Sequence, residues 1–187
     1  LTADHGEAFG EHNSLGHGTL YEEVVHVPLI IAGAGIKAGT IVKEPVELMD
    51  LAPTIADLVG ISSVKGFHGR SLLPVIKDGQ KITEGTIATR LIPEWGQRLI
   101  SYRTPEWKYI RTESLDEANT VLSEELYHLR NDPQERHNAH GSEAEAARAF
   151  ELEAIDKILE FKRLKSEEKT AYEKERIRAN LKKLPKL

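Results

Sequence analysis

The fold is decided by a short stretch near the start of the chain, in which acidic residues, histidines and glycines are followed directly by an apolar run. It reads Asp4-His5-Gly6-Glu7, Gly10-Glu11-His12, Gly16-His17-Gly18-Thr19-Leu20-Tyr21-Glu22-Glu23 and then Val27-Pro28-Leu29-Ile30-Ile31. In open α/β sheets, ligands bind where strands end and loops begin. This order of residues therefore predicts part of a metal site at the edge of a buried sheet.

Asp4 and His5 are adjacent and follow a short apolar lead, residues 1–3. A carboxylate oxygen suits calcium or magnesium, whereas an imidazole nitrogen suits zinc, manganese or iron. If the lead is the end of a strand, both side chains lie where the strand gives way to a loop, which makes them candidate metal ligands. Two adjacent ligands do not complete a metal site. The alternative is that Asp4 caps a turn while His5 is a solvated loop residue.

His17 lies between two glycines, Gly16 and Gly18. Glycines let the backbone approach a ligand closely, so this histidine has little local steric cover. A histidine in such a position can bind an anion as imidazolium or donate a proton to a leaving group. The alternative is a glycine-rich surface loop with an incidental histidine.

Several motifs taken together resemble the C-terminal half of a sulfatase, a member of the alkaline-phosphatase-like superfamily of metal-dependent esterases. Besides the stretch quoted above, the matching segments are residues 45–54 (PVELMDLAPT), 69–74 (GRSLLP), 103–109 (RTPEWKY) and 125–133 (ELYHLRNDP). They follow one another in the same order as in that family. The resemblance covers roughly residues 1 to 140.

The resemblance implies roles for three residues. Asp4 and His5 match the family's second pair of metal ligands, and His17 matches a position that contacts the sulfate group. The family's metal is usually calcium, although an Asp-His pair also occurs in relatives that use manganese or another transition metal. The implied activity is hydrolysis of a sulfate ester with a divalent metal. The implied fold class is α/β: part of an alkaline-phosphatase-like sheet with helices, followed by a small antiparallel sheet packed with a C-terminal helix.

The nucleophile of the family has no counterpart in this chain. In sulfatases it is a formylglycine, made by oxidation of a cysteine or serine in an N-terminal Cys- or Ser-x-Pro-x-Arg motif. The chain contains no cysteine and no Ser-x-Pro-x-Arg sequence, and it begins at Leu1. The first pair of metal-binding aspartates is missing too. We expect a piece of a longer protein or a truncated gene product, with the formylglycine in the missing N-terminal part, that does not hydrolyse sulfate esters alone.

Composition is that of an ordinary folded chain. The 187 residues are 40% hydrophobic and 29% charged, enough to bury a core. A net charge of −5 gives no reason to expect a nucleic acid as partner. No run approaches the ~20 apolar residues that span a bilayer, so no membrane partner is expected. The compartment is left open, because a chain without disulfides occurs anywhere.

Residues 1–80 are expected to form the C-terminal part of the sulfatase catalytic α/β domain. Residues 24–31 read as a buried strand, because they are apolar and β-branched apart from Pro28. A helix is expected from Asp50, whose carboxylate can cap it, to Gly60, which stops it. Its apolar face is predicted from Leu51, Ile55 and Leu58.

Residues 81–165 are expected to form a small α+β subdomain, an antiparallel meander with a helix. The β-leaning segments are residues 86–89, 98–103, 108–111 and 125–129. Four aromatic residues are assigned to its core in preference to a carbohydrate-binding platform: Trp95, Trp107, Tyr109 and Tyr127.

The last part of the chain is expected to be helical. Ser142 and Glu145 have the spacing of a capping box. The apolar stripe of the helix is predicted from Leu152, Ile155 and Leu159. Residues 166–187 are expected to form a charged helical tail with a weaker stripe, which is Ile177, Leu181 and Leu184, and Pro185 is expected to end it. A free helix needs a partner to cover such a stripe, so homo-oligomerisation through the tail is a further expectation.

Two other functions are compatible with the sequence. Sulfate and phosphate are both tetrahedral oxyanions, so the chain also fits a phosphate- or phosphonate-ester hydrolase of the same superfamily. The missing nucleophile fits a non-catalytic remnant that acts as a binding or assembly module.

Overall fold

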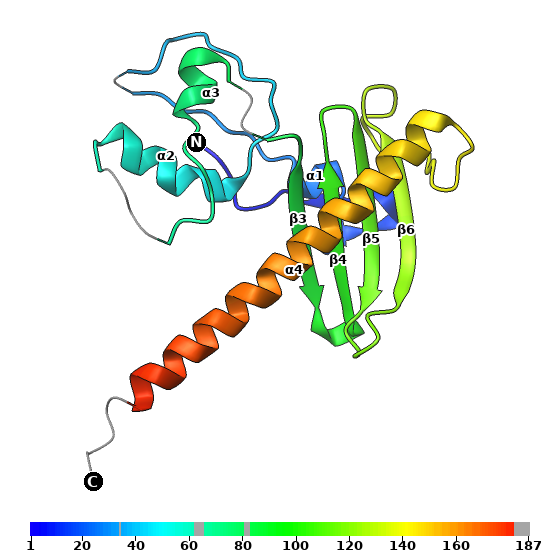
Figure 1. Ribbon diagram of the computed structural model, residues 1–187. Helices are drawn as coiled ribbons and strands as arrows, with labels where there is room; N and C mark the ends of the chain where they lie inside the picture. The colour runs from blue at the N-terminus through cyan, green and yellow to red at the C-terminus, as the bar shows by residue number, and fades with distance from the viewer. Residues whose placement is uncertain (34, 62–65, 81–82, 182–187) are drawn as a thin grey trace.

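The computed structural model describes residues 1–33, 35–61, 66–80 and 83–181, and the side chains of all of these except residue 173 and residues 175–181. Figure 1 shows a four-stranded sheet crossed on one face by the long helix α4 (Glu145–Leu181), with a lobe of loops and short helices beside it. The lobe contains α2 (Leu51–Leu58) and α3 (Leu73–Asp78). This mixed architecture agrees with the predicted α/β class.

The sheet is the antiparallel meander that the sequence predicts. Its strands lie in the order β3 (Thr86–Ile92), β4 (Gln97–Arg103), β5 (Trp107–Ser114) and β6 (Val121–His128). All neighbours are antiparallel. Each strand overlaps one of the four predicted segments. Because side chains alternate along a strand, the register gives the sheet two chemically different faces.

One face of the sheet packs against α4. Four buried residues on the strands contact four on the helix: Ile100, Tyr102, Tyr109 and Leu126, with Ala147, Phe150, Ala154 and Ile158. The spacing on the helix is three and four residues, the period of one helical face. The two alanines carry short side chains, which let the helix lie close to the tyrosines.

The prediction therefore placed the apolar stripe on the wrong side of α4. Leu152 and Leu159 are 66% and 51% exposed, and only Ile155 packs against the core. The predicted capping box is also absent, because Glu145 is the first residue of the helix and Ser142 Oγ accepts from the Ala144 amide at 3.3 Å. The face that packs on the sheet combines two large residues, Phe150 and Ile158, with two alanines, so large side chains alone do not single it out.

The opposite face of the sheet is covered by residues from the start of the chain. Leu20 packs with Ile110, Tyr127 and Leu129. It is followed by the short helix α1 (Glu22–Val25), which Figure 1 shows behind the sheet. Two further short strands, β1 (Ala8–Phe9) and β2 (Leu15–Gly16), form an antiparallel hairpin before it.

The predicted strand at residues 24–31 is wrong. The first two of these residues end α1, and the rest have no regular secondary structure. Acidic residues favour the first turn of a helix, and Glu22 and Glu23 occupy that turn of α1. Of the apolar run, Ile30 pairs with the chain start: its amide donates to the Leu1 carbonyl at 2.8 Å and its carbonyl accepts from the Leu1 amino group at 2.7 Å.

The predicted helix after Asp50 is confirmed as α2, although Asp50 itself acts differently from the prediction. The Asp50 carboxylate accepts from the backbone amides of Glu47 at 3.0 Å and Arg70 at 2.9 Å, and so ties three segments together instead of capping α2. Ile55, expected on the apolar face, is 59% exposed. Gly60 follows the helix with a φ of 75°, as a stop residue should.

The core assignment of the aromatic residues is confirmed for Tyr109 and Tyr127, which are buried, and for Trp107, which packs against the α4 face. Trp95 is 69% exposed and belongs to no core. It lies in a short 3-10 helix, η3 (Pro93–Trp95), between β3 and β4.

The second half of α4 extends past the sheet (Figure 1). The stripe at Ile177, Leu181 and Leu184 and the predicted stop at Pro185 lie outside the described side chains, so oligomerisation through the tail stays a prediction. The predicted domain boundary near residue 80 adjoins residues 81–82, which also lie outside the described residues.

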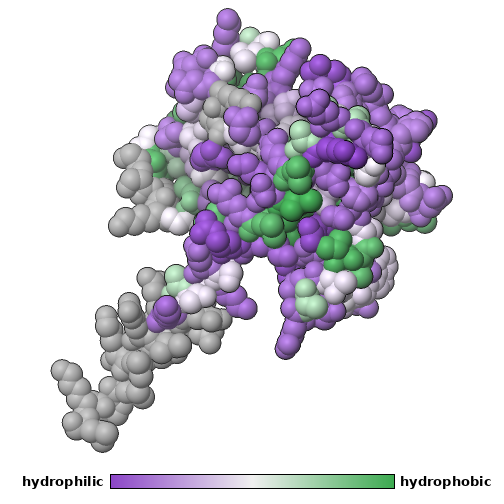
Figure 2. Space-filling model, turned by 45° about the vertical axis from the view of Figure 1, so that its right-hand side comes forward, coloured by the Kyte–Doolittle hydropathy of each residue, from purple (hydrophilic) through white to green (hydrophobic). Residues whose placement is uncertain are grey.

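The surface drawn in Figure 2 is mostly hydrophilic, with apolar side chains gathered in small patches. Among the described residues, no helix combines the length and the hydrophobicity that crossing a membrane requires.

Candidate functional site

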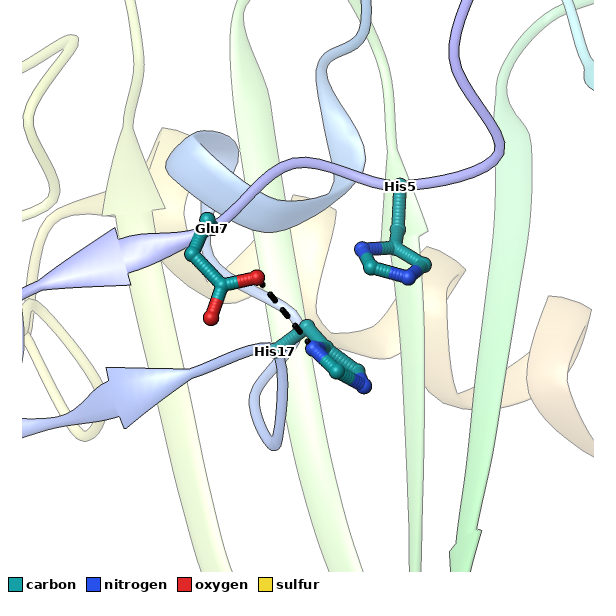
Figure 3. Close-up of side chains that lie close together, drawn as sticks. All are labelled: His5, Glu7 and His17. Atoms are coloured by element: carbon teal, nitrogen blue, oxygen red, sulfur yellow. Dashed lines mark hydrogen bonds and ion pairs between the residues drawn. The ribbon is translucent and has the colours of Figure 1, made fainter.

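Two of the three residues singled out in the sequence, His5 and His17, meet in space. The β1–β2 hairpin, in which Ala8 pairs with Gly16, folds the chain back so that residues 5 and 17 lie side by side. Their rings stack with centroids 4.1 Å apart and an interplanar angle of 25° (Figure 3). Both side chains are partly exposed, His5 at 41% and His17 at 45%. The pair is therefore accessible to a ligand.

The hydrogen bonds of the two rings define which nitrogen faces a ligand. His5 Nδ1 lies 2.8 Å from the Gly6 carbonyl oxygen, and His17 Nδ1 lies 3.3 Å from Glu7 Oε2. Both partners only accept, so each Nδ1 carries a proton and donates it. In a neutral ring, Nε2 then holds the free lone pair, the arrangement found in metal-binding histidines.

Asp4 is the third predicted residue, and it lies beside His5. Its carboxylate accepts from the His5 amide at 3.1 Å, and its Oδ2 is 3.8 Å from His5 Nε2. The side chain is 91% exposed. Divalent cations are held at about 2.0–2.6 Å by such ligands, so one cation can contact both atoms. The pair fits part of a metal site and leaves the remaining coordination positions to other groups.

Glu7 is a site residue that the sequence reasoning missed. His5, Glu7 and His17 each offer a ligand atom, and these atoms all lie within 4.8 Å of one another. Two imidazoles and a carboxylate are a ligand set typical of transition metals. The signal in the sequence was the spacing of two between His5 and Glu7, which places both on one side of an extended segment. The structure thus contains two overlapping ligand sets that share His5.

Gly6 holds this segment against α1. Its amide donates to the Val24 carbonyl at 2.7 Å, and a Cβ at this position would lie 2.0 Å from the Glu23 carbonyl oxygen. Only glycine permits such an approach of two backbones. The positions of His5 and Glu7 therefore depend on where α1 lies.

The three predicted residues line an open cleft of about 830 Å³ between the start of the chain and the sheet. The strands β3, β4 and β5 also line it and carry three cationic side chains, which are Arg90, Arg103 and Lys108. Glu22, another lining residue, is paired with Arg103 and Lys108, so the charge of Arg90 is the one that best suits an anionic ligand beside the histidines.

A buried ion-pair network fixes α1 to the sheet at the base of this cleft. Lys108 Nζ is fully buried and contacts Glu22 Oε1 at 3.1 Å and Glu135 Oε1 at 2.8 Å. Arg103 Nε contacts the same Glu22 oxygen at 3.1 Å. Burial alone would raise the pKa of Glu22, but Lys108 and Arg103 outweigh it and lower that pKa. Burial raises the pKa of Glu135, and Lys108 offsets this only in part.

His12 adds a second tie between the start of the chain and the Glu135 loop. Its Nδ1 lies 2.8 Å from Glu23 Oε1, and its Nε2 lies 2.9 Å from the Glu135 carbonyl oxygen. Both partners accept, so the imidazolium form satisfies both bonds. Burial lowers the pKa of His12, but these acceptors together outweigh it and raise that pKa above its usual value.

In a comparison with protein-family models, the family described as N-sulphoglucosamine sulphohydrolase, C-terminal, matches residues 10–163. Among curated proteins, human arylsulfatase K is 34% identical over 147 residues, which cover 73% of this chain and 26% of the relative. A delta 4,5-hexuronate-2-O-sulfatase of Bacteroides thetaiotaomicron is 34% identical over 151 residues, covering 74% of this chain and 29% of the relative. The chain thus spans a quarter to a third of the length of these relatives.

Solved structures agree with the sequence matches. The structure of BT1596, described as a 2-O GAG sulfatase, aligns with a TM-score of 0.63 at 27% identity, covering 95% of this chain and 37% of that one. A phosphonate monoester hydrolase from Silicibacter pomeroyi aligns with a TM-score of 0.68 at 28% identity, covering 86% and 33%. The family match covers most of the chain and includes the His17 loop, the sheet and the first part of α4, and the chain therefore belongs to the sulfatase family, as a C-terminal domain of the N-sulphoglucosamine sulphohydrolase type.

Proposed function

We propose that this chain is the C-terminal part of a metal-dependent hydrolase that cleaves sulfate esters, and that it supplies one side of the active site. The observation that carries the proposal is the meeting of His5 and His17, twelve positions apart, in a cleft that Arg90 also lines. The relatives named above as sulfatases support the choice of sulfate esters.

His17 is the residue that binds the sulfate group in this proposal. Glu7 accepts the Nδ1 proton and so orients the ring, which presents Nε2 to the cleft. Protonated, this ring donates to a sulfate oxygen and neutralises charge that develops on it in the transition state. Glu7 acts through His17 and is a positioning residue.

Asp4 and His5 are the metal-binding residues in this proposal. The Gly6 carbonyl fixes the His5 tautomer, and Asp4 adds a hard oxygen ligand beside it. When bound, a divalent cation, calcium or else manganese or another transition metal, polarises a sulfate-ester oxygen and favours the ionised nucleophile. The nucleophile and the other ligands come from residues outside this chain, as the family resemblance implies.

The proposal predicts binding without turnover for the chain alone. Inorganic sulfate should shift the NMR resonances of the His17 ring, and His17→Ala should abolish that response, whereas His137→Ala, at an exposed histidine outside the cleft, should not. Aryl sulfate should not be hydrolysed by the chain. Hydrolysis that Asp4→Ala abolishes would show that the chain completes a site by itself and would contradict the proposal.

A second candidate is hydrolysis of phosphate or phosphonate esters. It is favoured by the structural likeness to the phosphonate monoester hydrolase, which has the higher TM-score of the two structures compared. Paired aryl sulfate and aryl phosphonate substrates, given to the chain together with the sequence that precedes it in its gene, separate the two by the ratio of kcat/KM. If that preceding sequence carries no nucleophile motif and neither ester is cleaved, the chain is a non-catalytic binding module.

A further inference from the structure

Two buried polar atoms in the cleft have no hydrogen-bond partner. They are the Oγ1 of Thr19 and the Nε of Arg90. Both residues line the same cleft as His5 and His17. A buried donor without an acceptor is unfavourable, and in native proteins such atoms are uncommon. Their location in one cleft points to a ligand that supplies the missing acceptor.

Arg90 differs from the other two cations on its wall of the cleft. Arg103 and Lys108 are both paired with Glu22. Arg90 lies on β3 opposite Leu99 of β4, whereas Arg103 of β4 lies opposite Thr86 at the start of β3. Within the described part of the chain, Arg90 has no ion pair with a carboxylate. Its charge is therefore free to interact with a ligand in the cleft.

The chemistry of the two groups defines what that ligand must offer. A guanidinium presents its N–H groups as a planar fork that matches the two oxygens of a carboxylate or of a sulfate. A threonine hydroxyl donates one further hydrogen bond to an oxygen. Thr19 is two residues from His17, so an anion bound by Thr19 and Arg90 would lie close to a sulfate bound at His17.

We propose that Arg90 and Thr19 form a second anion subsite, which binds a carboxylate or a second sulfate on the alcohol half of the ester. The inference rests on the proposed function for the first anion, the sulfate at His17. It deepens that function by naming the substrate class: esters that carry another negative charge near the scissile sulfate. Neutral sulfate esters lack a partner for Arg90 and bind more weakly.

The Nε–Hε resonance of Arg90 in the NMR spectrum of the 15N-labelled chain tests this directly. The titrants are methyl glucuronide, which supplies a carboxylate, methyl glucoside 6-sulfate, which supplies a sulfate, and neutral methyl glucoside. We expect the Arg90 signal to move to saturation with one or both charged sugars and to stay in place with the neutral one. A response to the carboxylate or to the sulfate alone identifies which group the subsite takes.

Three variants complete the test. Arg90→Gln should weaken binding of the charged sugar by about tenfold or more, and Arg90→Lys, which keeps the charge but loses the fork, by less. Arg98→Gln is the matched control, because Arg98 lies on the same sheet but does not line the cleft. Each variant is first checked for a native spectrum.

His17→Ala separates the two claims. If methyl glucuronide moves the Arg90 signal in both the parent and His17→Ala, while inorganic sulfate does not move the His17 resonances of the parent, the second subsite stands and the proposed function falls. If no charged sugar moves the Arg90 signal, or if Arg90→Lys and Arg90→Gln bind as tightly as Arg98→Gln, the subsite is wrong whatever happens at His17.

Discussion

The two faces of the four-stranded sheet differ in the contacts that hold them. Against α4 the contact is mainly apolar: the rings of Tyr102, Trp107 and Phe150 stack at centroid distances of 5.7 and 6.1 Å, and an ion pair, from Lys162 to the buried Glu113 at 2.7 Å, lies beside this apolar cluster. Against the start of the chain, the contact includes the fully buried Lys108 between Glu22 and Glu135. Hydrophobic packing is roughly proportional to the area buried and is non-directional, whereas a buried ion pair fixes one geometry.

This difference matches the different roles of the two faces of the sheet. The α4 face carries no residue of the candidate site, and it needs only to keep the sheet folded. The other face must hold α1, and through Gly6 the segment with His5 and Glu7, in one position. We infer that the apolar face provides most of the stability and that the charged face provides the geometry of the site.

The largest loss of stability is expected from Phe150→Ala. Phe150 is 6% exposed and its removal opens a cavity in the α4 face, which costs about 3–5 kcal/mol of unfolding free energy. Urea unfolding measures this change. Leu152→Ala on the same helix removes a side chain that is 66% exposed and should change stability by less than about 0.5 kcal/mol. Similar losses for both would show that α4 packs differently.

Lys108→Met tests the other face with a change of similar volume. It leaves Glu22 and Glu135 buried without their shared cation, at a cost of about 3 kcal/mol. The cost is at the lower end of the range for broken buried pairs, because the raised pKa of Glu135 lets that carboxyl take up a proton. Unlike Phe150→Ala, this variant should also shift the NMR resonances of residues 5–25. A variant as stable as the parent would contradict the structural role of the ion pair.

Gly6→Ala tests the geometry of the site more directly than Lys108→Met does. The added methyl group would overlap the Glu23 carbonyl, so the segment must move away from α1 at a cost of about 1–3 kcal/mol. We expect the stacked rings of His5 and His17 to separate, which ring-to-ring nuclear Overhauser effects detect. Gly18→Ala, where a Cβ has open space, is the control and should leave those effects in place.

The smallest effect is a pH dependence from His12. Its pKa is raised in the folded chain, so its stabilisation is complete below the unfolded pKa of about 6.5 and is lost as the pH rises through the raised folded value. Unfolding free energy should therefore fall from pH 6 towards pH 8 in the parent and fall less in His12→Gln. His137→Gln, at a histidine that is 87% exposed, should behave like the parent. Parallel pH profiles of unfolding free energy for all three proteins would refute the stabilising role of the His12 hydrogen bonds.

Local patterns predicted the small sheet well, because each strand pairs with its sequence neighbour and short β-rich segments separated by turns indicate that topology. They failed at residues 24–31, where an apolar run alone does not distinguish a strand from a short helix and an extended segment. They also misplaced the face of α4, since large apolar residues lie on more than one side of this helix, and the alanines that complete the buried face with Phe150 and Ile158 are a weak signal.

The candidate site shows the same limit. The sequence indicated Asp4, His5 and His17 through their residue types and the family resemblance. It did not indicate Glu7, whose role depends on the β1–β2 register, or Arg90, which reaches the cleft only because β3 lies beside the start of the chain. Contacts between distant segments are set by packing, and no local pattern encodes them.

The central claim is that Asp4 and His5 bind the metal while His17 is left to bind the sulfate group. Titrating the chain with Mn2+ and following the paramagnetic broadening of each residue tests it, with Asp4→Ala and Glu7→Gln as the two variants. We predict weak binding that broadens residues 4 and 5 first, that Asp4→Ala abolishes and that Glu7→Gln preserves, with His17 still responding to sulfate. Broadening that survives Asp4→Ala but disappears in Glu7→Gln would place the metal on His5, Glu7 and His17, and would contradict the account.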